Sequence, residues 1–128
     1  MQIITENNLP IITTNYPEIP ELIELLTGVQ GDIQDFIEYP DSPLGDLSAE
    51  LHSIVYHATE DTGTITITFD ITKCEYQDQD AINYAAKEAC TARHALPEVL
   101  SNQFDMLFGD YKYIVTPNTL IFTATYEF

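Results

Sequence analysis

Strict alternation of apolar and polar residues marks the middle of the chain, as expected of a strand with one buried face. The residues of this run are Ile65, Ile67, Phe69 and Ile71 on one face, and Thr64, Thr66, Thr68, Asp70 and Thr72 on the other. Turn-forming residues 60–63 separate it from a preceding β-rich run. The sequence therefore predicts a hairpin with strands at 51–59 and 64–72, although the apolar residues of 47–58 also fit a helical stripe.

A second hairpin is predicted at the end of the sequence. In "YKYIVTPNTLIFTATYEF", two β-rich runs at 111–116 and 119–128 flank the turn-forming pair Pro117-Asn118. The residues that share one face of the last run are Leu120, Phe122, Ala124, Tyr126 and Phe128. We expect this last strand to be a sheet edge, at which Tyr126 and Phe128 bind a partner.

Helical spacing occurs in three other segments. In "YPEIPELIELLTG" the apolar residues recur with helical spacing, Pro20 suits the first turn and Gly28 suits the end, which predicts a short N-terminal helix. The alanine-rich segment 80–96 predicts the longest helix, broken by Pro97, and 98–108 predicts a further helical piece. The stretch "GDIQDFIEYP" fits either a helical turn capped by Asp32 or the beginning of a strand. Its Pro40, with Pro43, predicts an exposed connection.

The first fifteen residues are typical of an extended arm or edge strand, because Pro10 interrupts a short β-rich run. A chain of 128 residues suits a single domain, 1–128. The order of elements predicts an α+β fold. In this fold a mainly antiparallel sheet of two hairpins packs against one long helix, with a short helix near the N-terminus.

Charge changes this picture more than composition does. The chain has 4 Lys and Arg against 21 Asp and Glu, a formal net charge of −17. No Lys or Arg occurs from Met1 to Thr72, where thirteen of the carboxylates lie. An apolar content of 45% places this charge on a folded body rather than on a disordered tail. We therefore expect no direct binding to nucleic acid and none to a membrane.

Cysteine usage and the N-terminal residues bear on the compartment. Met1 leads into "QIITENNLPIITT", which has neither a basic region nor an apolar run of signal-peptide length. A cytoplasmic origin is therefore expected. In that compartment Cys74 and Cys90 are expected to be reduced thiols that pack as small apolar groups, although a pairing is conceivable.

Two arrangements of Cys and His resemble sites, and both lack a necessary part. Cys90 and His94 are four residues apart on the predicted helix, and Cys74 with His52 or His57 could complete a zinc site. Structural zinc sites use close ligand pairs on both sides, and here there is one such pair. As a thiol nucleophile and its base, the same pair lacks an orienting third group.

The acidic stretch "EYQDQD" offers Glu75, Asp78 and Asp80 as calcium ligands, but it lacks the glycine turn and the distant glutamate of a calcium loop. Helix capping accounts for these residues better. The sequence also has no glycine-rich phosphate loop and no serine-centred elbow. We therefore expect a protein that is not an enzyme and has no cofactor and no metal.

Two functions would use such a field of carboxylates. A rigid body with carboxylates spaced like phosphates can occupy the basic groove of a nuclease or a DNA-binding complex. Alternatively, an acidic ring wall repels a passing nucleic acid and keeps it from sticking. For either use, the partner-binding candidates in the acidic half of the chain are Glu18, Glu21, Glu24, Asp32, Asp35, Glu38, Asp41 and Asp46.

The order of elements resembles a known family. A short N-terminal helix, "EYPDSP", a hairpin, the helix "DAINYAAKEACTA" and a closing hairpin ending in "TATYEF" are similar to the layout of small tail-terminator and head-to-tail connector (neck) proteins of tailed phages. The resemblance covers most of the chain. It implies a virion protein without a cofactor that forms a homo-oligomeric ring and binds other virion proteins through sheet edges. The family does not require such acidity, so a DNA-mimic inhibitor (anti-restriction, anti-CRISPR or nuclease-immunity protein) is the alternative.

Overall fold

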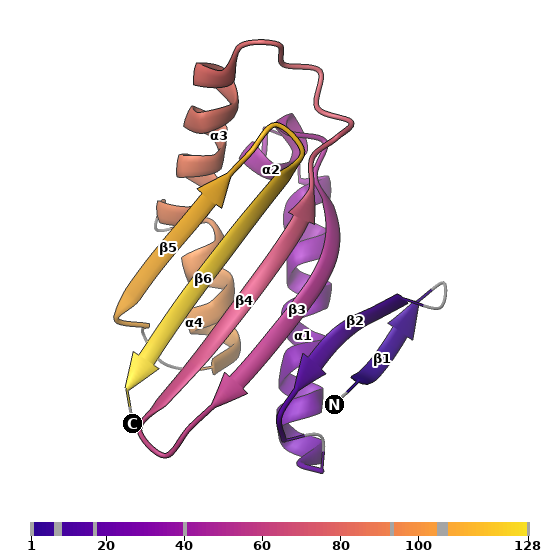
Figure 1. Ribbon diagram of the computed structural model, residues 1–128, viewed down its shortest axis with the longest axis vertical. Coiled ribbons are helices and arrows are strands. Elements are labelled where there is room, and N and C mark those ends of the chain that lie inside the picture. The colour runs from indigo at the N-terminus through magenta and orange to yellow at the C-terminus, as the bar shows by residue number, and fades with distance from the viewer. Residues whose placement is uncertain are drawn as a thin grey trace.

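The computed structural model consists of a single six-stranded sheet with helices packed on one face (Figure 1). The structure describes the backbone of residues 2–6, 9–16, 18–39, 41–92, 94–104 and 108–127, with side chains from residue 12 onward. The strand order is β1-β2-β3-β4-β6-β5, antiparallel throughout except for the parallel pair of β2 and β3. The strands are β1 (Gln2–Glu6), β2 (Leu9–Thr14), β3 (Glu50–Ala58), β4 (Thr62–Asp70), β5 (Asp110–Val115) and β6 (Thr119–Glu127).

Four helices complete the α+β fold, which confirms the predicted fold class. They are α1 (Pro20–Glu38), α2 (Pro43–Asp46), α3 (Gln79–Thr91) and α4 (Leu96–Phe104). All four lie on the same side of the sheet, while the other face of the sheet is turned toward the viewer in Figure 1 and is uncovered. The core therefore lies between the helices and the inner sheet face.

Both predicted hairpins are present, with strand ends within two residues of the expected ones. In β4, Ile65, Ile67 and Phe69 are fully buried, and the threonines between them are half-buried. The segment 47–58, which also fitted a helical stripe, is a strand from Glu50 onward. Burial on one face of β3, with Ile54 and Tyr56 inside, is what selects the strand.

The N-terminal helix is longer than predicted. Gly28 does not end α1, which continues through Gly31 to Glu38 and is the longest helix of the described chain. The apolar stripe of the first turns continues in the buried residues Val29 and Ile33, so tertiary packing outweighs the poor helix propensity of glycine. The ambiguous stretch "GDIQDFIEYP" is therefore helical up to Glu38.

The connection after α1 is not the exposed loop that Pro40 and Pro43 predicted, although Pro40 itself lies outside the described residues. Ser42 caps the short helix α2, since its hydroxyl accepts a hydrogen bond from the Gly45 amide at 3.3 Å. Leu44 and the following Leu47 are fully buried, so this turn inserts two side chains into the core. Pro43 fixes the backbone at the start of α2, and the leucines determine its burial.

The segment 80–96 contains a shorter helix than expected. Helix α3 ends at Thr91, and Pro97 lies in the first turn of α4 rather than inside one long helix. Asp78 caps α3 by accepting a hydrogen bond from the Asp80 amide at 3.0 Å, as the capping interpretation predicted. Because the helix has already ended, His94 does not lie one helical turn beyond Cys90 on a common face.

Strand β6 is not a sheet edge, which corrects the expectation for the C-terminal segment. It pairs with β4 on one side and β5 on the other. The crossover through α3 and α4 places β5 one strand away from β4, and β6 lies between them. Tyr126 is buried and its hydroxyl hydrogen-bonds to that of Tyr56. Its ring lies so close to Gly63 that a Cβ there would overlap it. Tyr126 thus closes the core, and Phe128 lies outside the described residues.

Two glycines in α1 give a matched test of this packing. No atom lies within 4 Å of a Cβ built at Gly31, whereas one at Gly28 would lie 2.5 Å from the Gln103 side chain of α4. We expect Gly31→Ala to raise the free energy of unfolding by about 0.5–1 kcal/mol, because alanine loses less backbone entropy in a helix. In urea unfolding, Gly28→Ala should gain less than this or lose stability. Equal stabilisation by both substitutions would contradict the packing of α1 on α4.

Candidate protein-interaction surface

Helix α1 carries most of the predicted acidic candidates on its outer side. Glu21, Glu24, Asp35 and Glu38 are exposed, opposite the buried stripe of the helix. Glu18, just before α1, is exposed as well. The last turn of the helix has no basic residue, so Asp35 and Glu38 face the negative end of the helix dipole without compensation. Asp35 and Glu38 therefore do not stabilise the helix that carries them, whereas Glu21 lies in the first turn, where the positive end of the dipole favours a carboxylate.

Asp32 differs from the other candidates because the fold uses it. Its Oδ2 accepts a hydrogen bond from the Gln103 side-chain amide at 2.7 Å, which joins α1 to α4. The side chain is half-buried. Asp32 therefore helps to position the two helices against each other, and is less free than its neighbours to meet a partner.

Asp41 and Asp46 line a hollow of about 470 Å³ between α2 and α3. Glu88, His94, Tyr76 and Tyr84 complete its polar and aromatic lining. The tyrosine side chains are accessible, with 39% of Tyr76 and 67% of Tyr84 exposed. Carboxylates beside aromatic faces suit a cationic side chain, such as an arginine or lysine of a basic protein.

A second hollow, of about 320 Å³, lies between α1 and α4. Asp32, Asp35 and Glu98 contribute carboxylates to it, together with Tyr39, which is 70% exposed. His94 lines both hollows, so the two are neighbours on the helical side of the molecule. The structure thus brings Asp32, Asp35, Asp41 and Asp46 around one region, while Glu18, Glu21 and Glu24 lie toward the other end of α1.

Sequence reasoning did not single out Glu88, Glu98 or the three exposed tyrosines. Tyr84 and Glu88 are four residues apart on α3, so helical periodicity could have placed them on one face. Their proximity to Asp41 and Asp46 depends on the packing of α2 against α3, for which the sequence has no local signal. We call the outer surfaces of α1–α4, with these two hollows, the acidic helical face.

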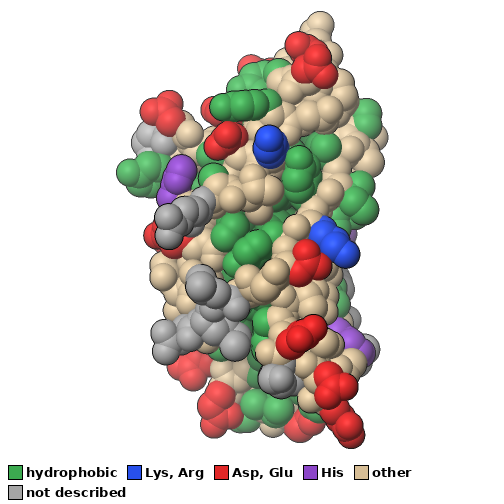
Figure 2. Space-filling view, turned by 90° about the vertical axis from the view of Figure 1, so that its left-hand side faces the viewer, with side chains coloured by type: hydrophobic (Ala, Val, Ile, Leu, Met, Phe, Trp, Pro, Cys, Tyr) green, Lys and Arg blue, Asp and Glu red, His purple; other side chains and the backbone are tan. Residues whose placement is uncertain are grey.

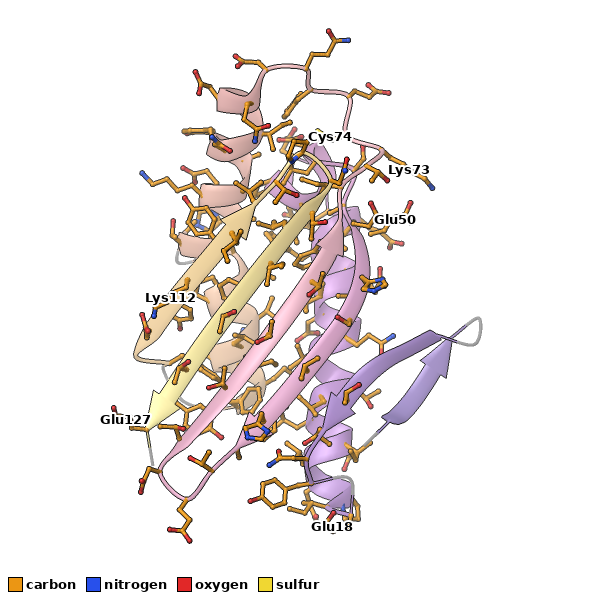
Figure 3. The ribbon with its side chains drawn as sticks, viewed as in Figure 1. Glu18, Glu50, Lys73, Cys74, Lys112 and Glu127 are labelled. Atoms are coloured by element: carbon orange, nitrogen blue, oxygen red, sulfur yellow. The ribbon has the colours of Figure 1, made fainter. Side chains whose placement is uncertain are left out.

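The uncovered sheet face is not acidic in its middle. The outward side chains in the middle of β3, β4 and β6 are Ser53, Val55, His57, Thr64, Thr66, Thr68, Ile121, Thr123 and Thr125, without a carboxylate. Acids of the sheet lie toward its ends and its β5 border (Figure 3). Two of them form exposed ion pairs, Glu50 with Lys73 at 2.6 Å and Asp110 with Lys112 at 3.6 Å.

The metal and nucleophile candidates do not form a site in the described chain. Among the described residues, no three His, Cys, Asp or Glu side chains are grouped so as to hold a metal ion. Cys90 is fully buried, and burial raises the pKa of its thiol to about 12. Cys74 is half-buried, and both cysteines are free thiols. A buried thiol with so high a pKa is protonated near neutral pH and is a poor nucleophile or ligand.

Comparisons of the chain with protein-family models, with curated proteins and with solved structures find no match. The resemblance to tail-terminator and connector proteins therefore stays a prediction from the sequence. Within the described residues, no helix combines the length and apolar character that crossing a bilayer requires. The function has to be inferred from the two faces of the molecule.

The two cysteines should differ sharply in reactivity. Iodoacetamide added to the native protein at mildly alkaline pH is expected to modify Cys74 and to leave Cys90 intact. Burial shields the Cys90 thiol from the reagent and keeps it protonated. Peptide mass mapping measures the modification at each position. In urea both thiols should react, and a Cys74→Ser variant should show almost no native labelling. Rapid labelling of Cys90 in the folded protein would contradict the buried environment.

Proposed function

We propose that this protein is a non-enzymatic virion assembly protein, a ring-forming tail-terminator or neck subunit that binds copies of itself and other virion proteins. The observation that supports the proposal is the separation of charge between the two faces. Carboxylates gather on the acidic helical face, and the middle of the open sheet face has none. One face suits repulsion of nucleic acid, and the other suits protein contacts.

The acidic face fits a role beside moving DNA. A surface that repels phosphates prevents adhesion, and a low salt concentration extends the repulsion. A closed ring of such subunits would carry on the order of a hundred negative charges. Subunit contacts must therefore avoid opposed carboxylates, which favours the sheet over the helices as the contact region.

Free sheet edges also support ring formation. Within the described strands, β1 pairs only with β2 and β5 pairs only with β6, so the sheet ends in an edge on both sides. Unpaired backbone groups on an edge strand are a template for a neighbouring chain. A head-to-tail ring requires two different contact surfaces on each subunit, and two different edges satisfy this requirement.

A DNA-mimic inhibitor is the second candidate, favoured by the exposed tyrosines among the carboxylates. A surface that only repels DNA gains nothing from Tyr39 and Tyr84, which are 70% and 67% exposed. Tyrosine is enriched at protein interfaces, where it supplies contact area with little loss of conformational entropy. On this alternative, the acidic helical face binds the basic groove of a nuclease or DNA-binding complex.

Mass in solution tests the ring proposal. Native mass spectrometry and light scattering of the full chain should detect a discrete closed oligomer, favoured as added salt screens the repulsion between subunits. The same preparation should show no saturable shift of duplex DNA at low salt, because the acidic face cannot replace the counterions of DNA.

Two other outcomes are informative. A chain that stays monomeric or dimeric at all salt and protein concentrations contradicts the ring proposal. If such a protein also binds a purified basic nuclease with an affinity that falls steeply with salt, and loses it in a Tyr84→Ala variant, the DNA-mimic function is supported. Val55→Ala, on the open sheet face, is the matched control and should bind the nuclease as the wild type does.

A further inference from the structure

We propose that two copies of this chain pair through the outer edge of β5, in an antiparallel arrangement centred on Tyr113. The contact would extend the sheet of one copy into the sheet of the other. A two-fold contact uses the same strand of both copies, so it excludes a head-to-tail contact through β5, and a ring built from such pairs would close through the β1 edges instead. The inference does not rest on the proposed function.

The backbone of β5 is suitably oriented for this pairing. Ile114 lies opposite Ile121, and the Thr116 amide donates to the Thr119 carbonyl at 2.8 Å. In an antiparallel ladder the hydrogen-bonded pairs alternate, so the even-numbered residues of β5 bond to β6. The amides and carbonyls of Tyr111, Tyr113 and Val115 therefore point toward the outer edge.

The side chains along this edge are apolar rather than acidic. Tyr111, Tyr113 and Ile114, with two residues of β6, line a hollow of about 450 Å³ in which Lys112 is the charged residue. Ile114 is 63% exposed. Figure 2 views the molecule from this side, and hydrophobic side chains gather in the middle with most Asp and Glu around them. Natural edge strands are usually protected by charge, proline or bulges, and between Tyr111 and Val115 the only such device of β5 is Lys112.

The sequence of β5 complements itself in one register. A two-fold axis perpendicular to the sheet, midway between the two copies of Tyr113, places Tyr113 opposite its copy and Tyr111 opposite Val115. Aromatic pairs and aromatic pairs with β-branched residues are favourable across strands. On the other face, Lys112 falls opposite Ile114, so its aliphatic stem covers an exposed apolar side chain. No carboxylate faces another carboxylate.

Neighbouring registers are less favourable. Centring the pair on Lys112 places this lysine opposite its own copy, and centring it on Tyr111 or on Ile114 shortens the overlap of the two strands, because β5 begins at Asp110 and ends at Val115. For a chain of net charge −17, a contact between identical copies is feasible only where carboxylates do not oppose one another. The self-complementary edge meets this condition, which is why we assign the second copy as the occupant.

Charge substitutions at Ile114 test the register, because the register and the net charge alone predict opposite effects on dimerisation. Ile114→Lys changes the net charge from −17 to −16 (−17 + 1) and Ile114→Glu changes it to −18 (−17 − 1). General repulsion predicts stronger association for the lysine variant. The proposed register places the introduced lysine opposite Lys112 twice per pair, so we expect about fivefold to tenfold weaker dimerisation. Ile114→Glu should keep or strengthen it, because each introduced glutamate meets Lys112.

Sedimentation equilibrium of the wild type and both variants measures these dissociation constants. Val55→Lys and Val55→Glu are the matched controls, since Val55 is also outward-facing and 39% exposed but lies away from β5. The dissociation constants of these control variants should follow net charge alone. Equal dimerisation of both Ile114 variants, a larger effect at Val55, or a wild type that is monomeric throughout would overturn the inference. A ring that is insensitive to Ile114 would overturn the inference and leave the proposed function standing.

Discussion

Repulsion among carboxylates is the constraint that the rest of this structure has to satisfy. A 128-residue chain with a net charge of −17 stays folded only if its apolar core outweighs that repulsion. The described ion pairs contribute little to this balance, because both involve exposed side chains at the ends and border of the sheet. Stability therefore depends on the packing of the helices against the inner sheet face, with Phe69 and Phe122 fully buried at its centre.

The same constraint underlies the uses that we propose for the surfaces. Acids on α1 have no basic residue near them on that helix, and neighbouring pairs such as Glu21 with Glu24 and Asp35 with Glu38 repel each other. Groups that weaken a fold are maintained when another molecule requires them, whether a nucleic acid to be kept away or a basic protein to be bound. The sheet, by contrast, offers threonines, a few apolar side chains and free edges to neighbouring chains.

Local patterns predicted local structure well. The alternation around Ile67 is sufficient to define β4, because strand periodicity and burial of one face coincide there. The length of α1 could not be predicted in the same way, since Gly28 is a helix terminator by propensity and becomes a contact point only when Gln103 of α4 packs against it. The interior position of β6 depends on how the crossover spaces β4 and β5. The residues of β6 itself contain no signal for this spacing.

The candidate surface shows the same division. Its exposed acids on α1 follow from helical periodicity, but the hollows require α2, α3 and α4 to converge, and so Glu88 and Glu98 could not be identified beforehand. Tyr126 illustrates the opposite error. The sequence pattern places Tyr126 on the apolar face of the last strand. The sheet order, which the pattern does not give, places this strand inside the sheet and buries Tyr126 against Tyr56. Side-chain pattern identifies a face, while topology decides whether solvent, helix or neighbour covers it.

If the exposed acids of α1 beyond its first turn oppose folding, removal of their charges stabilises the protein. Urea unfolding, at several salt concentrations, of a variant with Glu24→Gln, Asp35→Asn and Glu38→Gln measures this effect, and leaves in place Glu21, which the helix dipole favours in the first turn. This variant should be more stable than the wild type at low salt, by about 0.2–0.5 kcal/mol for each relieved pair of neighbouring charges, and its stability should depend less on salt. A variant that is less stable than the wild type at low salt would show that these carboxylates support the fold instead of opposing it.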